Sequence, residues 1–127
     1  MAGIYIHIPF CKTKCHYCNF FSVASQKHRP QFVSRLVDEI SLQKNYLKGQ
    51  TIHTIYLGGG TPSLLEVAEL DQIFTTLYNY FIISDDVEIS LEANPDDVNE
   101  TWVKQILNSR VNRLSIGVQS FYDTDLK

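Results

Sequence analysis

The sequence predicts an α/β fold in which a βαβαβαβ run builds a parallel sheet. Four short runs of β-branched and aromatic residues alternate with three longer segments of helical apolar periodicity. Strands that alternate with helices form parallel sheets with right-handed crossovers. No linker, low-complexity tract or internal repeat divides the 127 residues, so we expect a single domain over residues 1–127.

The first βα unit begins with residues 3–8, which alternate in the manner of a strand and stop at Pro9. A polar segment follows, and Pro30 suits the first turn of a helix predicted over about residues 30–48. Gly49, after a basic residue, is a typical helix end. The apolar face of this helix is expected to comprise Phe32, Val33, Leu36, Val37, Ile40 and Leu47.

The second βα unit has its strand at residues 51–57, which are β-branched and aromatic. Gly-Gly-Gly-Thr-Pro at residues 58–62 is the predicted turn. Ser63 and Glu66 have the spacing of a capping box, which predicts a helix that runs to about Tyr80. The inward face of this helix is predicted to carry Leu70, Ile73, Phe74 and Leu77.

The last elements follow the same order. Residues 87–93 alternate cleanly and predict a third strand. Residues 94–97 form a turn, and Asn99 is expected to cap a helix over about residues 100–109. The apolar face of that helix is predicted to carry Val103, Ile106 and Leu107. Residues 113–118 are predicted to form the fourth strand.

Composition and charge exclude several classes of function. A net charge of -3 and a pI near 5.7 indicate no basic field for nucleic acid. No apolar run is long enough to span a membrane, and the N-terminus lacks a secretory signal pattern. The chain has an odd number of cysteines, three, and all lie within eight residues. This favours reduced thiols over a framework of paired disulfides. We therefore predict a cytoplasmic protein.

The chemically distinctive residues are predicted to meet at one edge of the sheet. Cys11, Cys15 and Cys18 follow the first strand, and the glycine run follows the second. Glu92 ends the third strand, and Gln119 ends the fourth. Ligands of parallel α/β sheets gather at the carboxyl ends of the strands, so this agreement predicts a binding site there.

The cysteines have the spacing C-x3-C-x2-C, which is suited to a soft metal centre. Three thiolates on a [4Fe–4S] cluster would leave one iron without a protein ligand, and an open metal position is a feature of catalytic sites. The alternative is a structural zinc site, for which His7 or His16 would be the fourth ligand. Three free thiols without a metal would not require this spacing.

The glycine run and Glu92 each have a functional and a purely structural interpretation. Three glycines let a ligand approach the backbone closely, but a tight strand–helix turn also favours them. The run lacks the lysine of a P-loop and the spacing of a dinucleotide fingerprint. Glu92 is suited to accepting hydrogen bonds from ribose hydroxyls, or it is a solvated charge at a strand end.

Four stretches carry a specific resemblance: Tyr-Ile-His-Ile-Pro-Phe-Cys at 5–11, Gly-Gly-Gly-Thr-Pro at 58–62, Glu-Ala-Asn-Pro at 92–95, and residues 113–121. Together with the cysteine spacing, they resemble the radical S-adenosylmethionine (SAM) superfamily. Within it they resemble the oxygen-independent coproporphyrinogen III oxidase family and its haem-chaperone branch. The resemblance covers essentially the whole chain, in order.

This resemblance implies a fold, cofactors and site residues. The four strands would be the first four of a partial (β/α)6 radical SAM barrel. Cys11, Cys15 and Cys18 would ligate a [4Fe–4S] cluster, SAM would chelate the fourth iron, and an external electron donor would reduce the cluster. The residues that would bind SAM or lie beside it are Tyr5, Tyr17, Gly59, Gly60, Thr61, Glu92 and Gln119. Tyr5 is equally compatible with a core position, and Gln119 would face a second SAM or the substrate. Haem or a porphyrin is the implied partner, with His7 as a possible contact or a hydrogen-bonded core histidine.

The chain departs from the oxidase pattern at Phe20, where the oxidase has a fourth cysteine. Its absence is typical of the haem-chaperone branch and places porphyrinogen decarboxylation in doubt. Oxidase activity and a non-catalytic haem or metal carrier remain alternatives. Family members are longer, so we expect an N-terminal part of the domain, without the rest of the barrel or a C-terminal domain. Such a part would turn over no porphyrin alone, because the walls of the substrate site would be missing, and it would self-associate along the open edge of the fourth strand.

Overall fold

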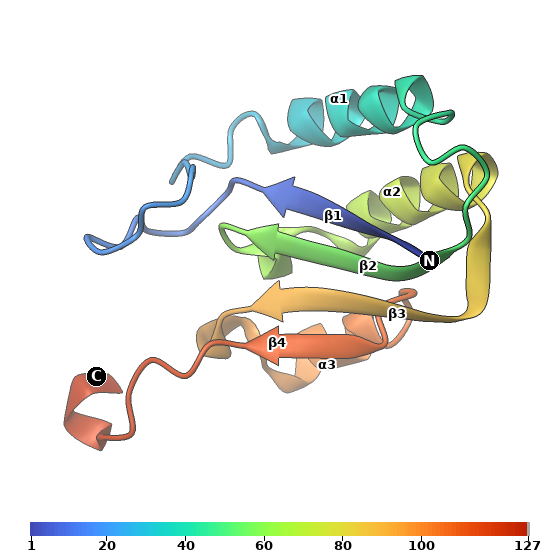
Figure 1. The fold of residues 1–127 in the computed structure, drawn as a ribbon. Helices are drawn as coiled ribbons and strands as arrows, with labels where there is room; N and C mark the ends of the chain where they lie inside the picture. The colour runs from blue at the N-terminus through green and yellow to red at the C-terminus, as the bar shows by residue number, and fades with distance from the viewer. Residues whose placement is uncertain (127) are drawn as a thin grey trace.

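A four-stranded parallel sheet forms the framework of the computed structural model, which describes residues 1–126. The strands are β1 (Ala2–Ile8), β2 (Ile52–Gly59), β3 (Ile83–Ala93) and β4 (Arg113–Ile116), in the spatial order β1-β2-β3-β4. Each neighbouring pair is parallel. Figure 1 shows all four arrowheads pointing to the same side, with the loop after β1 and the segment after β4 leaving at that edge. The predicted α/β class and the parallel βαβαβαβ arrangement are confirmed.

Three helices, α1 (Arg29–Leu42), α2 (Val67–Tyr80) and α3 (Glu100–Ile106), connect the strands. Single 3-10 turns add η1 (Pro62–Leu64), η2 (Pro95–Asp97) and η3 (Asp123–Leu126). One apolar cluster holds buried residues of all three helices together with alternate residues of the strands. Figure 1 shows α1 beside α2. The helices therefore cover one face of the sheet.

The opposite face carries the polar residues of the alternation. Tyr5 pairs with Tyr56 across β1 and β2, Tyr56 pairs with Ser90, and Glu92 pairs with Ser115 across β3 and β4. Because successive side chains of a strand point to opposite faces, these residues all lie opposite the helices.

Two predicted helix boundaries are wrong for reasons of packing. α1 ends at Leu42, and residues 43–49 form turns in which Gly49 has a φ of 76°. Leu47 still packs against the core from these turns, which explains why the apolar pattern continued past the helix. Ser63 does not cap α2, because it lies in η1. The capping box is formed by Glu66 and Glu69 instead.

The other boundaries differ less. Asn99 caps α3 as predicted, since its side chain accepts a hydrogen bond from the backbone N–H of Trp102 at 3.0 Å. Of the predicted apolar face, Ile106 is buried in the core as expected, whereas Val103 and Leu107 are exposed. Trp102 packs against the core instead of these two. β3 begins at Ile83, before the predicted start, and β4 ends at residue 116, before the predicted end at 118.

Candidate functional site at the carboxyl ends of the strands

The loop after β1, residues 9–28, holds the three cysteines, and its first part is hydrogen-bonded to its own returning segment. The backbone N–H of Cys11 donates to the Val23 carbonyl at 3.0 Å, and that of Val23 donates to the Pro9 carbonyl at 2.7 Å. The side-chain amide of Gln26 donates to the Cys11 carbonyl at 3.3 Å. Cys11 is thus the cysteine whose backbone is hydrogen-bonded across the loop, to residues of its returning segment.

Cys15 and Cys18 lie in the outer part of this loop. Their one mutual backbone bond runs from the Cys18 N–H to the Cys15 carbonyl, at 3.1 Å. All three thiols are free of disulfides, and Cys15 is exposed. Within residues 1–126, no three histidine, cysteine, aspartate or glutamate side chains are arranged to hold a metal ion. Convergence of the thiols stays a prediction, although three free thiols in one loop are the donor set of an iron–sulfur cluster.

Tyr17 connects this loop to the segment after β4. Its hydroxyl donates to the side-chain oxygen of Gln119 at 3.2 Å. A hydrogen bond to Cys15 raises the pKa of Tyr17 above its ordinary value, and the charges of Cys15 and Cys18 add to this. β4 ends at Ile116, so Gln119 lies in the following loop and not at the strand end as predicted. The structure nevertheless brings these two predicted residues together.

The glycine run is joined directly to the cysteine loop. The N–H of Gly60 donates to the Ile8 carbonyl at 2.8 Å, and the N–H of Thr61 donates to the Phe10 carbonyl at 2.6 Å. A Cβ at Gly60 would lie 2.6 Å from the Phe10 carbonyl oxygen. Gly59 has a φ of 110°, which favours glycine. Close packing against β1 therefore requires glycine at both positions, whatever ligand approaches them.

Glu92 is held in place by two donors. The Tyr56 hydroxyl donates to Oε1 at 2.7 Å, and the Gly59 N–H donates to Oε2 at 3.1 Å. The bond to Glu92 raises the pKa of Tyr56, because it favours the protonated phenol. Glu92 is half-buried and hydrogen-bonded, so it is not a freely solvated charge. Sequence reasoning missed Tyr56, although its alternation with Gly58 places it on the same face.

A small hollow lies between the glycine turn and the ends of β3 and β4. Its volume is about 170 Å³, and its lining consists of Gly60, Thr61, Glu92, Ala93, Asn94, Ser115 and Gly117. Thr61 is buried, and its hydroxyl accepts a hydrogen bond from the Asn94 side chain at 3.3 Å. At ~30 Å³ per water molecule, this volume corresponds to a few water molecules. The hollow therefore has room for one polar end of a ligand. Three of the predicted residues therefore share one surface.

Tyr5 and His7 lie beside this surface, on β1. The Tyr5 ring stacks on that of Tyr56, with 6.0 Å between centroids. Its hydroxyl lies 3.2 Å from His7 Nδ1, and His7 Nε2 lies 2.9 Å from the Phe21 carbonyl oxygen. Because the carbonyl accepts, Nε2 donates and Nδ1 accepts from Tyr5. Both histidine nitrogens are therefore used. Tyr5 is exposed, so it is not a core residue.

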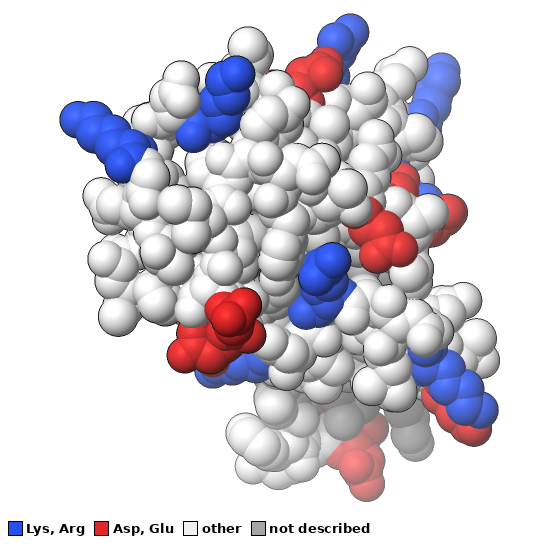
Figure 2. Space-filling view, turned by 90° about the vertical axis from the view of Figure 1, so that its right-hand side faces the viewer, with Lys and Arg blue, Asp and Glu red and all other residues white. Residues whose placement is uncertain are grey.

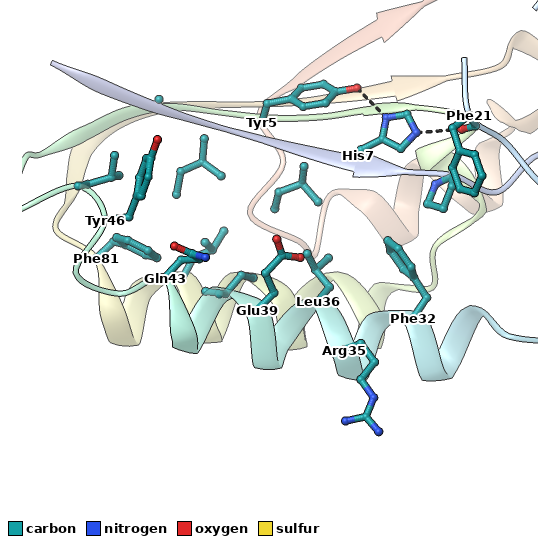
Figure 3. A pocket seen from close by; sticks show the side chains of 17 residues that line it. Tyr5, His7, Phe21, Phe32, Arg35, Leu36, Glu39, Gln43, Tyr46 and Phe81 are labelled. Atoms are coloured by element: carbon teal, nitrogen blue, oxygen red, sulfur yellow. Dashed lines mark hydrogen bonds between the residues drawn. The ribbon is translucent and has the colours of Figure 1, made fainter. Parts of the chain in front are cut away.

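A larger apolar groove of about 620 Å³ lies between β1 and α1. Figure 3 shows Phe32 and Leu36 lining it from the helix, while Arg35 points away. It includes Tyr5 and His7 but none of the cysteines, the glycine run or Glu92. Apart from Tyr5, the predicted site residues therefore gather at the sheet edge rather than in this groove.

On the face that Figure 2 shows, basic and acidic side chains are scattered, and no basic patch forms. Among residues 1–126, no helix combines the length and the apolar character that crossing a bilayer requires.

Comparison with known proteins places this geometry in context. A family model described as the radical SAM superfamily matches residues 5–127. The haem chaperone HemW of Escherichia coli K12 is 38% identical over 127 residues, which cover 98% of this chain and 34% of that protein. HemW of Buchnera aphidicola from Acyrthosiphon pisum is 37% identical, with the same coverage. The chain thus spans about a third of the length of these curated relatives.

Among solved structures, coproporphyrinogen III oxidase (HemN) from Escherichia coli, described as a radical SAM enzyme, matches with a TM-score of 0.85. The two sequences are 30% identical, and the match covers 96% of this chain and 29% of that chain. This likeness confirms the predicted radical SAM fold for the four-stranded sheet.

Proposed function

The chain belongs to the radical SAM superfamily, and from this membership we propose that it forms the cluster- and SAM-binding part of a haem-chaperone-like protein. The observation that carries the proposal is the direct attachment of the glycine turn to the cysteine loop. Two backbone hydrogen bonds, Gly60 to Ile8 and Thr61 to Phe10, place the turn against the start of that loop. Glu92 lies against the same turn through its bond from Gly59.

In this proposal Cys11, Cys15 and Cys18 would hold a [4Fe–4S] cluster and would leave one iron without a protein ligand, where SAM would bind. When bound and reduced by an external donor, the cluster would supply one electron for the reductive cleavage of SAM to methionine and a 5′-deoxyadenosyl radical. The chain's own contribution is to bind and orient SAM. Gly59, Gly60 and Thr61 line its path, and Tyr17 and Gln119 close the loop over it.

Glu92 is suited to the ribose of SAM because it is already oriented. A carboxylate has about four lone-pair positions, and the bonds from Tyr56 and Gly59 occupy two of them. The remaining two are available to a pair of vicinal hydroxyls. Tyr5, stacked on Tyr56, extends this surface along β1.

The similarity to HemW and the residue at position 20 favour a haem chaperone over an oxidase. Phe20 is exposed in the cysteine loop and offers no thiol. Porphyrinogen oxidation is the second candidate function, favoured by the likeness to HemN. A carrier that holds haem through His7 is disfavoured, because both ring nitrogens of His7 already have partners.

Anaerobic reconstitution with iron and sulfide tests the proposal. We expect a [4Fe–4S] absorption and paramagnetic resonance spectrum, and release of 5′-deoxyadenosine from SAM when a reductant is supplied. Cys15→Ala is the matched control and should abolish both. Measuring 5′-deoxyadenosine release with added haem and with added coproporphyrinogen separates the two candidate functions without requiring porphyrin turnover. Stoichiometric zinc binding without a cluster spectrum would refute the proposal.

A further inference from the structure

A lysine in the cysteine loop reaches a buried carboxylate that follows β3. Lys12 comes directly after Cys11, and its ammonium group forms an ion pair with Asp97 in η2. The Asp97 side chain is 6% exposed, whereas that of Lys12 is 57% exposed. Residues 85 positions apart in the sequence are thus joined across the ends of the strands.

Asp97 has a second partner in the turn after β2. The Ser63 hydroxyl donates to Asp97 Oδ2 at 2.7 Å, and Ser63 is itself buried. Its carbonyl accepts a hydrogen bond from the Trp102 ring N–H at 3.2 Å, which connects η1 to α3. Lys12, Asp97 and Ser63 therefore join the cysteine loop, η1 and η2. We call these three residues the clamp.

The burial of Asp97 makes its partners necessary. An ionised carboxylate removed from water is costly unless it is paired and hydrogen-bonded. Lys12 supplies the positive charge, so the loop segment that carries it is held close to η2. Because the half-exposed lysine is partly screened by water, we expect a moderate effect on loop position.

The clamp acts on one of the three cysteines. The backbone of Cys11 is hydrogen-bonded to Val23 and Gln26 of the same loop, and the neighbouring Lys12 pairs with Asp97 outside the loop. The described contacts of Cys15 and Cys18, by comparison, are local to the outer loop.

We propose that Lys12, Asp97 and Ser63 are positioning residues that hold Cys11 as the anchored ligand of the iron–sulfur cluster. This inference rests on the proposed function and extends it. The outer loop closes its two thiols toward a cysteine that is already in place. Loss of the clamp frees Cys11 and weakens retention of the cluster, without removing a ligand.

The test uses two variants and one matched control in the full chain. Lys12→Met removes the charge and keeps most of the aliphatic stem. Lys12→Met with Asp97→Asn also removes the unpaired buried charge, so that its fold is less strained. The control is Lys14→Met, which removes the same charge from an exposed position of the same loop.

The first measurement needs no cluster. In the reduced apo chain, iodoacetamide labelling is followed at each cysteine by mass spectrometry. We expect Cys11 to react about tenfold faster in both Lys12 variants, as loss of one charge-assisted hydrogen bond predicts. The Cys15 rate should be unchanged, and Lys14→Met should match the original chain at both cysteines.

The second measurement uses the reconstituted chain. Both Lys12 variants should take up the original amount of iron but lose it to a chelator about tenfold faster. The KM for SAM should rise while kcat changes less, and the thermal midpoint of the apo double variant should stay near that of the control.

The two measurements separate this inference from the proposed function. Unchanged Cys11 labelling overturns the clamp, whatever the cluster does. Faster labelling with unchanged iron loss overturns its role in holding the cluster. If the original chain assembles no cluster, the proposed function fails, and the clamp's cluster role falls with it. In that case the labelling rates still decide whether Lys12 positions Cys11.

Discussion

Replacement of Tyr56 by phenylalanine tests whether Glu92 is a preoriented binding group. The change removes the hydroxyl that donates to Glu92 Oε1 at 2.7 Å and leaves the ring stacked beside Tyr5. Hydrogen bonds to charged groups contribute about 1.5–3 kcal/mol. Because Glu92 is only half-buried, we take the lower end, about 1.5 kcal/mol, which corresponds to roughly a tenfold weaker affinity for SAM.

Calorimetric titration of SAM into the reconstituted chain measures this effect. Tyr80→Phe is the matched control, because it removes a phenol hydroxyl from α2, away from the sheet edge, where the side chain is 42% exposed. We expect its SAM affinity to equal that of the original chain. A change of less than about twofold in Tyr56→Phe, or an equal loss in both variants, would contradict the role assigned to Glu92.

Four further outcomes are expected. Gly60→Ala, whose Cβ would approach the Phe10 carbonyl to 2.6 Å, should lower the free energy of unfolding by about 1–3 kcal/mol in urea titrations. The raised pKa of Tyr56 stabilises the fold fully below the ordinary value of 10.0, and this contribution is lost as pH rises through the folded-state value. In urea titrations, the stability difference between the original chain and Tyr56→Phe should therefore be largest below pH 10 and should shrink as the pH rises further. Arg29→Met removes the hydrogen bonds that α1 donates to the carboxylates of Glu66 and Glu69 and to a carbonyl of η1. We expect the free energy of unfolding to fall by about 2 kcal/mol. The free edge of β4 should promote concentration-dependent self-association in light scattering, and Ile116→Lys should suppress it.

Part of the candidate site could be read from local sequence patterns. The cysteine spacing, the glycine run and the alternation up to Glu92 place three groups at the ends of successive strands, and parallel pairing brings those ends to one edge. Tyr56 was missed because a tyrosine within a strand carries no sign of which neighbour its hydroxyl will reach. Its partner lies 36 residues away, and only the register of β2 against β3 brings them together.

The capping of α2 illustrates the same limit. Ser63 and Glu66 have the correct spacing for a capping box, and local propensity favours serine as the cap. In the fold, the serine hydroxyl is committed to the buried Asp97, so the helix begins later and Glu66 takes the capping position. A tertiary hydrogen bond to a buried charge outweighs a local preference of about 1 kcal/mol.

The sequence by itself determined the order of the elements, the parallel sheet and the edge at which the cysteines, glycines and Glu92 gather. These follow from periodicity and turn chemistry, which act over a few residues. Only the tertiary structure decided which donors hold Glu92, which cysteine is anchored and that Lys12 reaches Asp97. Such contacts join residues tens of positions apart, and their strength depends on burial, which no local pattern specifies.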